Sequence, residues 1–370
     1  MILAAEIRST SCQKQSNSRS LSIHMRAIIM ILSVEGLFIL TGLEACSDSS
    51  SVQIRSPRQF TWTVDSISDP AQQVFVRDID GTAPDNVFAC FYSGGTHFQK
   101  LYRFDGASWT EVNLTQFGDS QTFYSLESIK TFPDGTIVVV GNRFYFVGGN
   151  TRDSSFAIVR QNGNWSEIVL PTRLRTLQAV GGSAATDVWF GGVDGVICHY
   201  NGTSVVFEQL PFSPPPRATS DPEYGFSNFV GDNANNVYVA LNTTNWSFLL
   251  HRSASGWSLI DSVAGVQWSL WYSPQKRLFI ARYSVDVYDG TSRRAILPSS
   301  AYVGYVHGTS EENLLALSWD NKLFHYNGFD WAELNVSQLK WDFHGGLYLT
   351  HGAAFIGGSD ATKSFLLRGR

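Results

Sequence analysis

The sequence predicts an all-β protein, and three observations carry this prediction. Aromatic residues make up 14% of the 370 residues, glycines number 32, and charged residues account for only 16%. Aromatic and β-branched residues favour strands, whereas glycines favour the turns between strands. A short strand–turn–strand pattern also recurs along the chain, as described below. An apolar content of 43% excludes a disordered chain, and the net charge of −5 gives no basic surface of the kind that binds nucleic acids.

The first element in chain order is an apolar segment at residues 27–43, preceded by Arg26. A positive residue, an apolar stretch and a small residue before the cleavage position are typical of a secretory signal peptide. The segment is shorter than the roughly 20 apolar residues that span a membrane, and Glu35 interrupts it. We therefore interpret residues 25–45 as a signal peptide and residues 1–24 as an extension from a misassigned start codon. An uncleaved anchor is the alternative.

The sequence Leu-Glu-Ala-Cys at residues 43–46 resembles the bacterial lipobox, in which the cysteine becomes the lipidated first residue of the mature chain. Glu44 departs from the small or apolar residue usual at that position. Residues 46–58 then form a polar tether similar to those of lipoproteins from the Bacteroides group. This resemblance implies lipidation at Cys46 and an outer-membrane lipoprotein of the cell envelope, facing the periplasm or the cell exterior.

The next elements form a repeat in which an apolar-x-polar segment ends in glycine, mostly as Asn-Gly or Asp-Gly. Its average interval of about 44 residues is the period of a four-stranded propeller blade. An Asn-Gly or Asp-Gly pair supplies the positive φ angles of a tight hairpin. A tryptophan opens the following strand in four units, whereas Val205 and Arg293 take its place in two others. The glycines are Gly106, Gly163, Gly202, Gly256, Gly290, Gly328 and Gly369, and the tryptophans are Trp109, Trp165, Trp257 and Trp331.

A second pair of strands precedes each hairpin. Runs such as 137–140, 188–190 and 314–317 are apolar at consecutive positions, which indicates strands buried on both faces, as in blades packed face to face. The last unit, residues 341–370, has only three strands, while residues 60–64 form a tryptophan strand with no unit before it. We expect this strand to complete the last blade, because ring closure removes exposed sheet edges. The prediction is a seven-bladed β-propeller over residues 59–370, with six or eight blades as alternatives.

The segment TDVWFGGVDGVICHYNG at residues 186–202 resembles the repeats of bacterial secreted propellers. The Gly-x-x-Trp turns of FDGASW and NGFDW are distantly similar to those of the Asp-box, or neuraminidase-repeat, propellers. The resemblance covers residues 60–370 and implies the propeller fold. Propellers host many unrelated activities, so the resemblance does not specify a function.

Several residues that could carry chemistry have simpler structural explanations. Cys90 and Cys198 fall in different blades, which predicts two buried free thiols rather than a disulfide. Three histidines recur with the repeat in a position that Arg103 and Arg160 fill in other units, so a structural role is expected. These are His199, His251 and His325, whereas His307, His344 and His351 do not share this position.

We predict no metal and no cofactor, because the chain contains no CxxC, HExxH or GxSxG motif. The carboxylates Asp78, Asp80 and Asp85 around Gly81 could bind calcium. The same stretch coincides with a blade turn, and turn formation by Asp and Asn side chains explains it more simply.

We expect ligands to bind at the end of the propeller where each innermost strand begins. An aromatic-rich mouth with an arginine suits stacking on sugar rings or gripping a peptide, although aromatic rings also pack between blades. The expected residues are Tyr124, Arg175, Tyr224, Trp268, Trp271, Tyr302, Trp341 and His344.

The resulting functional hypothesis is a monomeric, lipid-anchored propeller that acts as a non-catalytic binding or scaffold module for a glycan or protein. The alternative is a carbohydrate-active enzyme, such as a sialidase-like hydrolase or a polysaccharide lyase. That alternative requires an arginine cluster or two converging acids at the axis, for which Glu127 and Asp342 are the nearest candidates.

Overall fold

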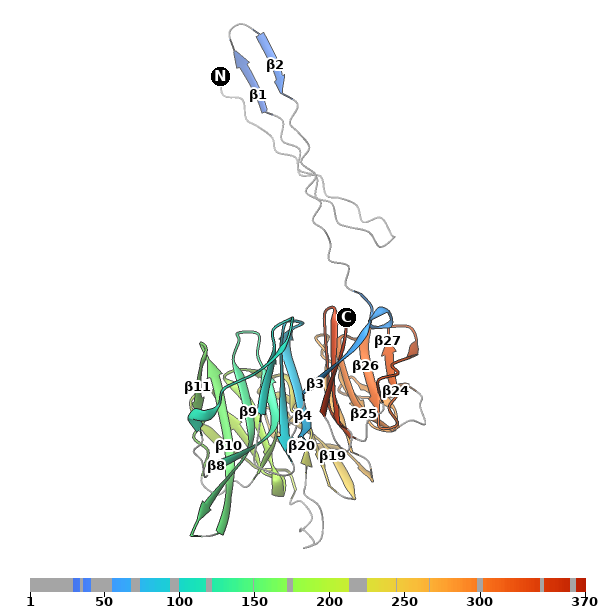
Figure 1. Cartoon of the computed structure of the whole chain (residues 1–370). Coiled ribbons are helices and arrows are strands. Elements are labelled where there is room, and N and C mark those ends of the chain that lie inside the picture. The colour runs from blue at the N-terminus through green and yellow to red at the C-terminus, as the bar shows by residue number, and fades with distance from the viewer. Residues whose placement is uncertain are drawn as a thin grey trace. The chain divides into compact units, whose positions relative to one another are not determined.

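The computed structural model describes residues 29–33, 36–40, 55–67, 74–93, 100–117, 122–148, 150–171, 176–212, 225–243, 245–265, 267–297, 302–339, 343–359 and 364–370. The chain divides into two units, residues 1–54 and 55–370. In the first unit, β1 (Ile29–Ser33) pairs antiparallel with β2 (Gly36–Leu40) (Figure 1). The rest of the predicted signal peptide and Cys46 lie outside the described residues. Within the described residues, no helix is long and apolar enough to cross a membrane.

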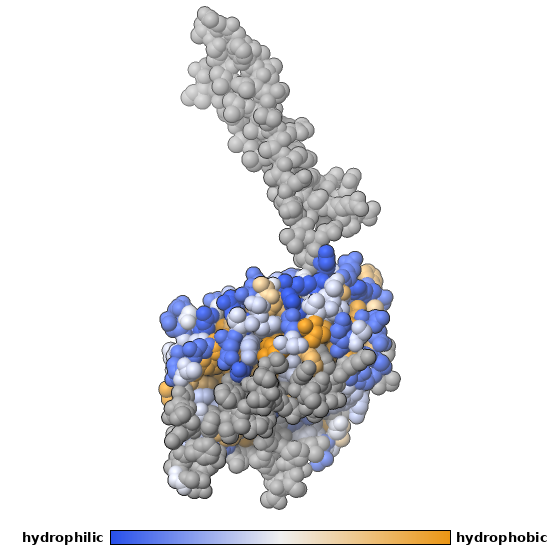
Figure 2. Space-filling view, in the orientation of Figure 1, coloured by the Kyte–Doolittle hydropathy of each residue, from blue (hydrophilic) through white to orange (hydrophobic). Residues whose placement is uncertain are grey.

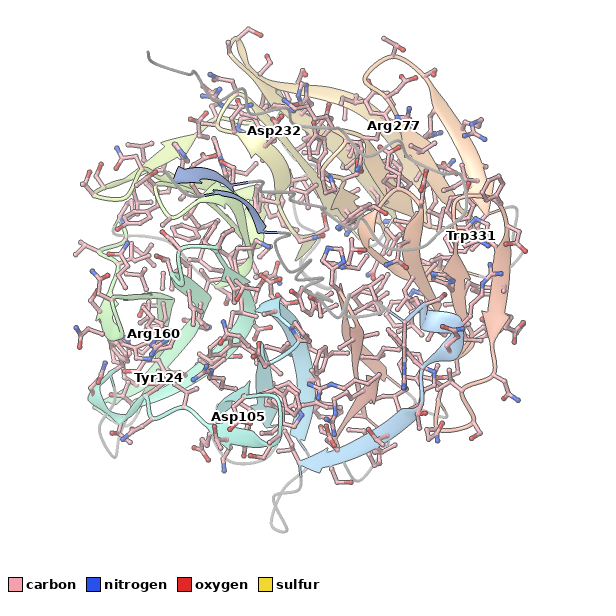
Figure 3. The ribbon with its side chains drawn as sticks, turned by 90° about the horizontal axis from the view of Figure 1, so that it is seen from above. Asp105, Tyr124, Arg160, Asp232, Arg277 and Trp331 are labelled. Carbon is pink, nitrogen blue, oxygen red and sulfur yellow. The ribbon has the colours of Figure 1, made fainter. Side chains whose placement is uncertain are left out.

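The second unit is a ring of seven antiparallel sheets, each a blade of four strands (Figure 3). The strands of one blade follow one another in sequence, and the first strands of neighbouring blades contact one another around the axis. Blade 1 contains β4 (Val74–Ala83), β5 (Asn86–Ser93), β6 (Lys100–Phe104) and β7 (Trp109–Glu111), and blade 2 contains β8 (Thr122–Thr131), β9 (Ile137–Val147), β10 (Asn150–Gln161) and β11 (Asn164–Glu167). Blade 3 contains β12 (Leu177–Ala184), β13 (Asp187–Gly192), β14 (Ile197–Tyr200) and β15 (Val205–Glu208).

The remaining blades repeat this order with small variations. Blade 4 contains β17 (Val230–Asn233), β18 (Asn236–Asn242), β19 (Trp246–Ser253) and β20 (Gly256–Ala264), and the short β16 (Gly225–Phe226) also pairs with β18. Blade 5 contains β21 (Ser269–Tyr272), β22 (Leu278–Ala281), β23 (Val285–Tyr288) and β24 (Arg293–Leu297). Blade 6 contains β25 (Val303–Ser310), β26 (Asn313–Ser318), β27 (Leu323–Tyr326) and β28 (Trp331–Leu334). Short 3-10 turns occur at Pro57–Gln59, Thr115–Phe117 and Val193–Gly195.

Blade 7 closes the ring, as the sequence predicts. Its strands are β29 (Phe343–Thr350), β30 (Ala353–Ser359), β31 (Ser364–Gly369) and, from the start of the unit, β3 (Trp62–Ile67). In the register of β3 with β31, Trp62 lies opposite Gly369 and Asp65 opposite Leu366. Backbone hydrogen bonds between Thr61 and Arg370 extend this pairing by one residue. The seven-bladed, three-plus-one architecture is therefore confirmed.

The hairpins between third and fourth strands adopt the expected turn. Six of their glycines have φ between 83° and 106°, a region that favours glycine. In four of the turns, the Asn or Asp before the glycine accepts two backbone N–H groups through Oδ1, at 2.8–3.0 Å. The glycines are Gly106, Gly163, Gly202, Gly256, Gly290 and Gly328, and the capping side chains are Asp105, Asn201, Asp289 and Asn327.

These turns define the two faces of the propeller. Because strands alternate in direction, the turns between third and fourth strands lie on the same face as those between first and second strands. We call this the hairpin face. The opposite face, where each first strand begins, is the mouth face. Arg58 donates to Asp330 in the blade 6 hairpin at 2.8 Å, and Arg370 donates to the carbonyl of Gly106 in the blade 1 hairpin at 3.0 Å. Residues on either side of the closure therefore lie on the hairpin face.

The core consists of apolar clusters between successive blades rather than a single centre. One cluster joins Val138 and Val140 of β9 to Val188 and Phe190 of β13. Every residue of β13 is buried, as predicted from its consecutive apolar residues. The outer strands instead expose part of their length, and the side of the propeller in Figure 2 accordingly shows mainly hydrophilic residues among the coloured atoms.

The recurring histidines have the structural role that the sequence predicts. The Nε2 atoms of His199, His251 and His325 each lie 2.9 Å from an Oδ1 atom of the residue that opens the second strand of the same blade. In blade 1, Arg103 fills this position and donates to Asn86 at 3.1 Å. The histidine partners are Asp187, Asn236 and Asn313. Cys90 and Cys198 are buried, free and in different blades, as expected.

Candidate functional site

A cavity of about 390 Å³ lies at the axis and is bounded by the first strands of the blades. Residues at the mouth face contribute to its lining, among them Asn242, the exposed Gln267 and Trp319. The cavity therefore reaches the mouth face, the end at which the sequence predicts a binding site. Its wall combines aromatic rings with charged and amide side chains.

Asp78 of β4 accepts several hydrogen bonds within this wall. Its carboxylate accepts the Ser128 hydroxyl at 2.7 Å, the Ile129 N–H at 3.0 Å and the Ile79 N–H at 2.9 Å. Ser128 in turn accepts the N–H of Val180, on the first strand of blade 3, at 3.3 Å. Neighbouring first strands belong to different sheets. Side chains therefore satisfy backbone groups that no sheet ladder reaches.

Asp80 and His307 perform the same task in different blades. Each lies opposite the third residue of the following strand, Asp80 opposite Phe88 and His307 opposite Leu315. Asp80 accepts the N–H of Thr131 in blade 2 at 2.7 Å, and Nδ1 of His307 accepts the N–H of Leu349 in blade 7 at 3.1 Å.

The expectation that Asp78 and Asp80 serve a blade turn needs correction. Both lie within β4, and their carboxylates bond to the next blade rather than to a turn. The turn lies further along, between Ala83 and Asn86, which pair at the end of the hairpin. Within the described residues, no group of three or more His, Cys, Asp or Glu side chains is placed to hold a metal ion.

Burial shifts the acid–base properties of this wall. Burial raises the pKa of Asp78 to about 6, although hydrogen bonds from Ile129 and Ser128 oppose the shift. Burial also lowers the pKa of His307 to about 4 and raises the pKa of Tyr305 to about 12, the latter with a further contribution from the nearby Asp78 charge. At neutral pH, Asp78 is therefore mostly ionised, His307 is neutral and Tyr305 keeps its proton.

The other charges of the wall occur as ion pairs. Arg77 lies 3.5 Å from Glu127, and Lys130 lies 3.0 Å from Asp80. Glu127, one of the two acids predicted for an enzymatic mechanism, therefore lies on the cavity wall beside an arginine. Asp342, the other predicted acid, lies outside the described residues.

The predicted binding residues have different locations. Trp268 and Trp271 line the cavity, and both are buried. Tyr302 lies beside the cavity, where its hydroxyl accepts the N–H of Gln267 at 2.9 Å. Tyr124 lies near the outside of the ring, as Figure 3 shows, with its ring centroid 4.4 Å from that of Phe156.

Four predicted residues have no described side chain. Arg175, Tyr224 and Trp341 lie outside the described residues. His344 belongs to β29, where its backbone pairs with Gly358, and its side chain lies outside the description.

The sequence singled out Asp78 and Asp80 as possible calcium or turn residues and set His307 apart from the recurring histidines, but it did not predict that they join neighbouring blades at the axis. The sequence does contain a common signal for Asp80 and His307. Each directly precedes a glycine, and that glycine pairs with the first apolar residue of the next strand. These pairs are Gly81 with Val87 and Gly308 with Leu314. At these two positions, a polar residue directly before a glycine in an inner strand marks the axial wall. The rim aromatic Trp319 lacks such a signal, because it lies in a connection between strands.

Together, the closed ring and the axial cavity define the chain as a seven-bladed β-propeller. No family model matches it, and a search of curated proteins finds no match. Solved structures with the same fold include a catalytically inactive virginiamycin B lyase from Staphylococcus aureus with quinupristin, at 13% identity and a TM-score of 0.55, over 83% of this chain and 99% of that one. YCF48 from Cyanidioschyzon merolae aligns at 11% identity and a TM-score of 0.54, over 82% of this chain and 98% of the other.

A third solved structure, YCF48 bound to D1 peptide, aligns at 14% identity and a TM-score of 0.54, over 83% of this chain and 96% of the other. At these identities, the likeness shows the fold alone.

Proposed function

We propose that this propeller is a non-catalytic binding module whose ligand, a glycan or a protein segment, enters the axial cavity from the mouth face. The observation that carries the proposal is the composition of the cavity wall. Trp268, Trp271 and Trp319 provide apolar surface, and Gln178 and Gln267 provide neutral polar groups. Polar surface exceeds apolar surface in this cavity, and polar groups that converge among aromatic rings in a concave site can orient a ligand.

The bonding of the acids favours binding over catalysis. Asp78 accepts three hydrogen bonds from the protein, and Asp80 accepts the backbone of Thr131 while pairing with Lys130. A catalytic acid or base needs a carboxylate oxygen within hydrogen-bond reach of the substrate. The oxygens of these two acids instead join neighbouring blades.

A carbohydrate-active enzyme is the second candidate, and one observation favours it. Asp78 and Glu127 both lie on the cavity wall, and the pKa of Asp78 is about 6, within the range of a general acid near neutral pH. Among proteins with this fold, one is a lyase and another is bound to a peptide, so the fold accommodates both kinds of function.

The proposal can be tested by blocking the mouth. Gln267→Trp places a large side chain at an exposed position of the cavity lining. Gln161→Trp makes the same change at an exposed position on the hairpin face and serves as the matched control. The purified full-length protein and both variants are screened for binding to soluble oligosaccharides and to a peptide library.

We expect Gln267→Trp to abolish binding of a probe that Gln161→Trp still binds. Binding that survives the blocked mouth would place the ligand elsewhere and contradict the proposal. Hydrolysis or elimination of an oligosaccharide by the wild-type protein, lost in Glu127→Gln, would establish the enzymatic candidate instead.

We also propose that the chain is a lipoprotein of the cell envelope, tethered through Cys46 and monomeric. The lipobox-like residues 43–46 and the preceding apolar segment support this proposal. Cys46→Ala removes the atom that would carry the lipid. We expect the variant to move from the membrane fraction to the soluble fraction on cell fractionation, with Cys90→Ala as the control that stays in the membrane. Unchanged membrane retention of Cys46→Ala would rule out lipidation at this residue.

A further inference from the structure

Three exposed aromatic side chains occupy corresponding places on the mouth face. Tyr283 and Trp319 belong to the connections between the second and third strands of blades 5 and 6, and Trp246 opens the third strand of blade 4, directly after the same connection. They are 53%, 38% and 45% exposed, respectively. Each of the three residues therefore keeps part of its ring at the surface of the mouth face. Such a row on a protein surface indicates a site of interaction.

A continuous series of ring contacts leads from this rim to the cavity. The ring centroid of Tyr283 lies 5.6 Å from that of Tyr302, Tyr302 lies 6.3 Å from Trp319, and Trp319 lies 6.1 Å from Tyr305. Trp319 and Tyr305 both line the cavity. We call Tyr283, Tyr302, Trp319 and Tyr305 the aromatic strip. It crosses blades 5 and 6 and connects the exposed rim to the axis.

The charged groups beside Tyr283 and Trp319, at the exposed end of the strip, occur in ion pairs, whereas the Asp78 charge lies near Tyr305 at its inner end. Arg282 donates to Asp286 at 2.9 Å, and Lys322 lies 2.8 Å from Asp320, so the charges next to Tyr283 and Trp319 pair with each other.

Neutral amides lie along the same rim. Gln267 is exposed and is held beside the strip by the hydrogen bond from its N–H to the Tyr302 hydroxyl. On blade 4, Asn242 bonds to both the N–H and the carbonyl of Trp268, at 3.1 and 3.2 Å. The rim thus combines aromatic rings with amide and hydroxyl groups, among which the Gln267 side chain is exposed.

We infer that the aromatic strip is an extended binding site for a neutral oligosaccharide whose end enters the axial cavity. A pyranose ring has an apolar C–H face that stacks on an aromatic ring and a rim of hydroxyl groups that bond to amides and phenols. Tyr and Trp suit such contacts because each combines a large apolar ring with a polar atom. This inference rests on the proposed binding function and names its ligand class.

The geometry favours a saccharide chain over the alternatives. A folded protein partner typically buries about 800 Å² of each surface, whereas the strip is a single row of side chains. An extended peptide brings a backbone N–H and C=O at every residue, each of which requires a partner when it is buried. Ring faces provide no such partners, but they suit the C–H faces of sugars.

The test measures binding of defined neutral oligosaccharides to the purified full-length protein by tryptophan fluorescence and by calorimetry. The probes are cello-, laminari-, xylo- and chito-oligosaccharides of two and six units, together with an unbiased peptide library. The variants are Trp319→Ala and Tyr283→Ala, with Tyr283→Phe to restore the ring. Phe329→Ala is the matched control, because Phe329 is a 95% exposed aromatic residue of blade 6 on the hairpin face.

We expect a hexasaccharide to bind more tightly than its disaccharide. Trp319→Ala and Tyr283→Ala should each weaken hexasaccharide binding by about tenfold or more, as loss of an aromatic anchor does, while Tyr283→Phe and Phe329→Ala keep wild-type affinity. Thermal unfolding of each variant verifies that it is folded. Because Tyr283 is half exposed, its variant keeps the test valid even if Trp319→Ala does not fold.

Two results would overturn the inference while the proposed function stands. One is oligosaccharide binding that Gln267→Trp abolishes but Trp319→Ala and Tyr283→Ala leave unchanged. The other is binding of a peptide, but of no oligosaccharide, at the mouth. Oligosaccharide binding that is lost in Tyr283→Ala but survives in Gln267→Trp would instead contradict the proposed entry of the ligand into the cavity. The strip would then bind the oligosaccharide without the cavity.

Discussion

Individual polar side chains join the blades around the axis. Asp80 in blade 1 and His307 in blade 6 occupy equivalent positions, and each accepts a backbone N–H from the first strand of the next blade. An acid and an imidazole can substitute for each other here because the position requires only a hydrogen-bond acceptor. The lowered pKa of His307 is consistent with this role, since a neutral imidazole keeps an acceptor nitrogen and an imidazolium does not.

Asp78 should give the protein a distinctive pH dependence. Its folded-state pKa of about 6 lies above the ordinary value of 3.8, so its contribution to stability is full below pH 3.8 and is lost as the pH rises through 6. Asp78→Asn removes this contribution. Relative to wild type, the variant should therefore gain on the order of 2 kcal/mol in the free energy of unfolding between pH 4 and pH 7. Urea denaturation at several pH values measures this difference.

Asp105, in the blade 1 hairpin, provides a control because its contribution to stability should change with pH in the opposite direction. The N–H groups of Ser108 and Ala107 hold the pKa of Asp105 below its ordinary value, so its contribution to stability is present above that value and is lost as the pH falls. Asp105→Asn should accordingly be more destabilising at pH 7 than at low pH. A stability difference between Asp78→Asn and wild type that is the same at pH 4 and pH 7 would show that Asp78 does not titrate in this range.

Among the structural elements, the hairpin between third and fourth strands is the one that the sequence predicts best. Its Asn-Gly or Asp-Gly pair acts locally, through a positive φ and a capping carboxylate or amide, so no distant contact is needed to recognise it. Even the two units without tryptophan start their fourth strands at Val205 and Arg293, as expected. The roles of polar residues in the inner strands could not be predicted in this way, because the hydrogen-bond partners of Asp78 and Asp80 lie in another blade.

Two hairpin glycines allow two effects of a glycine-to-alanine change on stability to be measured separately. One is the strain of a left-handed backbone, and the other is steric crowding of the new Cβ. Gly202 has a φ of 93°, and a Cβ there would lie 2.8 Å from Cγ2 of Thr186. Gly290 has a φ of 98°, and no heavy atom of the described residues lies within 4 Å of such a Cβ. We expect Gly290→Ala to cost about 1–2 kcal/mol from the left-handed backbone, and Gly202→Ala to cost about 1–3 kcal/mol more from overpacking.

Chemical denaturation of the two variants measures both effects. The double variant Gly202→Ala, Thr186→Ser removes the closest crowding atom and should recover most of the extra cost, although Cβ of residue 186 stays 3.3 Å away. Equal costs for the two single variants would mean that Thr186 moves aside freely.

At the scale of the whole molecule, ring closure depends on the pairing of β3 with β31. Asp65 of β3 strengthens this closure, since its carboxylate accepts Arg368 of β31 at 3.1 Å and Nε1 of Trp109 in blade 1 at the same distance. The ion pair and the tryptophan bond thus hold blade 7 and blade 1 together. This closure was predictable because the orphan strand and the incomplete last unit are both visible in the sequence.

A disulfide across the closure should stabilise the protein. Ser66 and Phe365 face each other in the register, and alternation from the bonded pair Thr61 and Arg370 makes them a non-hydrogen-bonded pair, with a Cα separation of about 4.5 Å that a disulfide tolerates. The double variant Ser66→Cys, Phe365→Cys closes a loop that contains most of the propeller. We expect the oxidised form to be about 2–4 kcal/mol more stable than the reduced form of the same variant.

Denaturation with and without reductant measures this difference. The single variant Ser66→Cys serves as the control, because its stability should not respond to reductant. Oxidised and reduced double variants of equal stability would indicate that the closure stays paired in the unfolded chain.

The axial cavity could be predicted only in part from the sequence, because its wall combines residues from several blades. Trp268 and Trp271 stood out as aromatic residues near the start of a first strand, and both line the cavity. The other wall residues Asp78 and Glu127 come from blades 1 and 2, and their distance from these tryptophans depends on how many blades close the ring. A difference of one blade would change every distance across the axis, so a sequence pattern within one repeat cannot specify the site.

The location of the two ends of the propeller has a consequence for its orientation. Arg58, near the start of the unit, and Arg370, at its end, both bond to hairpins on the face away from the cavity. An affinity tag or fused domain joined directly to either end would therefore be attached at the hairpin face and not at the mouth. Such an attachment leaves the mouth face uncovered, so either end is suitable for immobilising the protein in binding measurements.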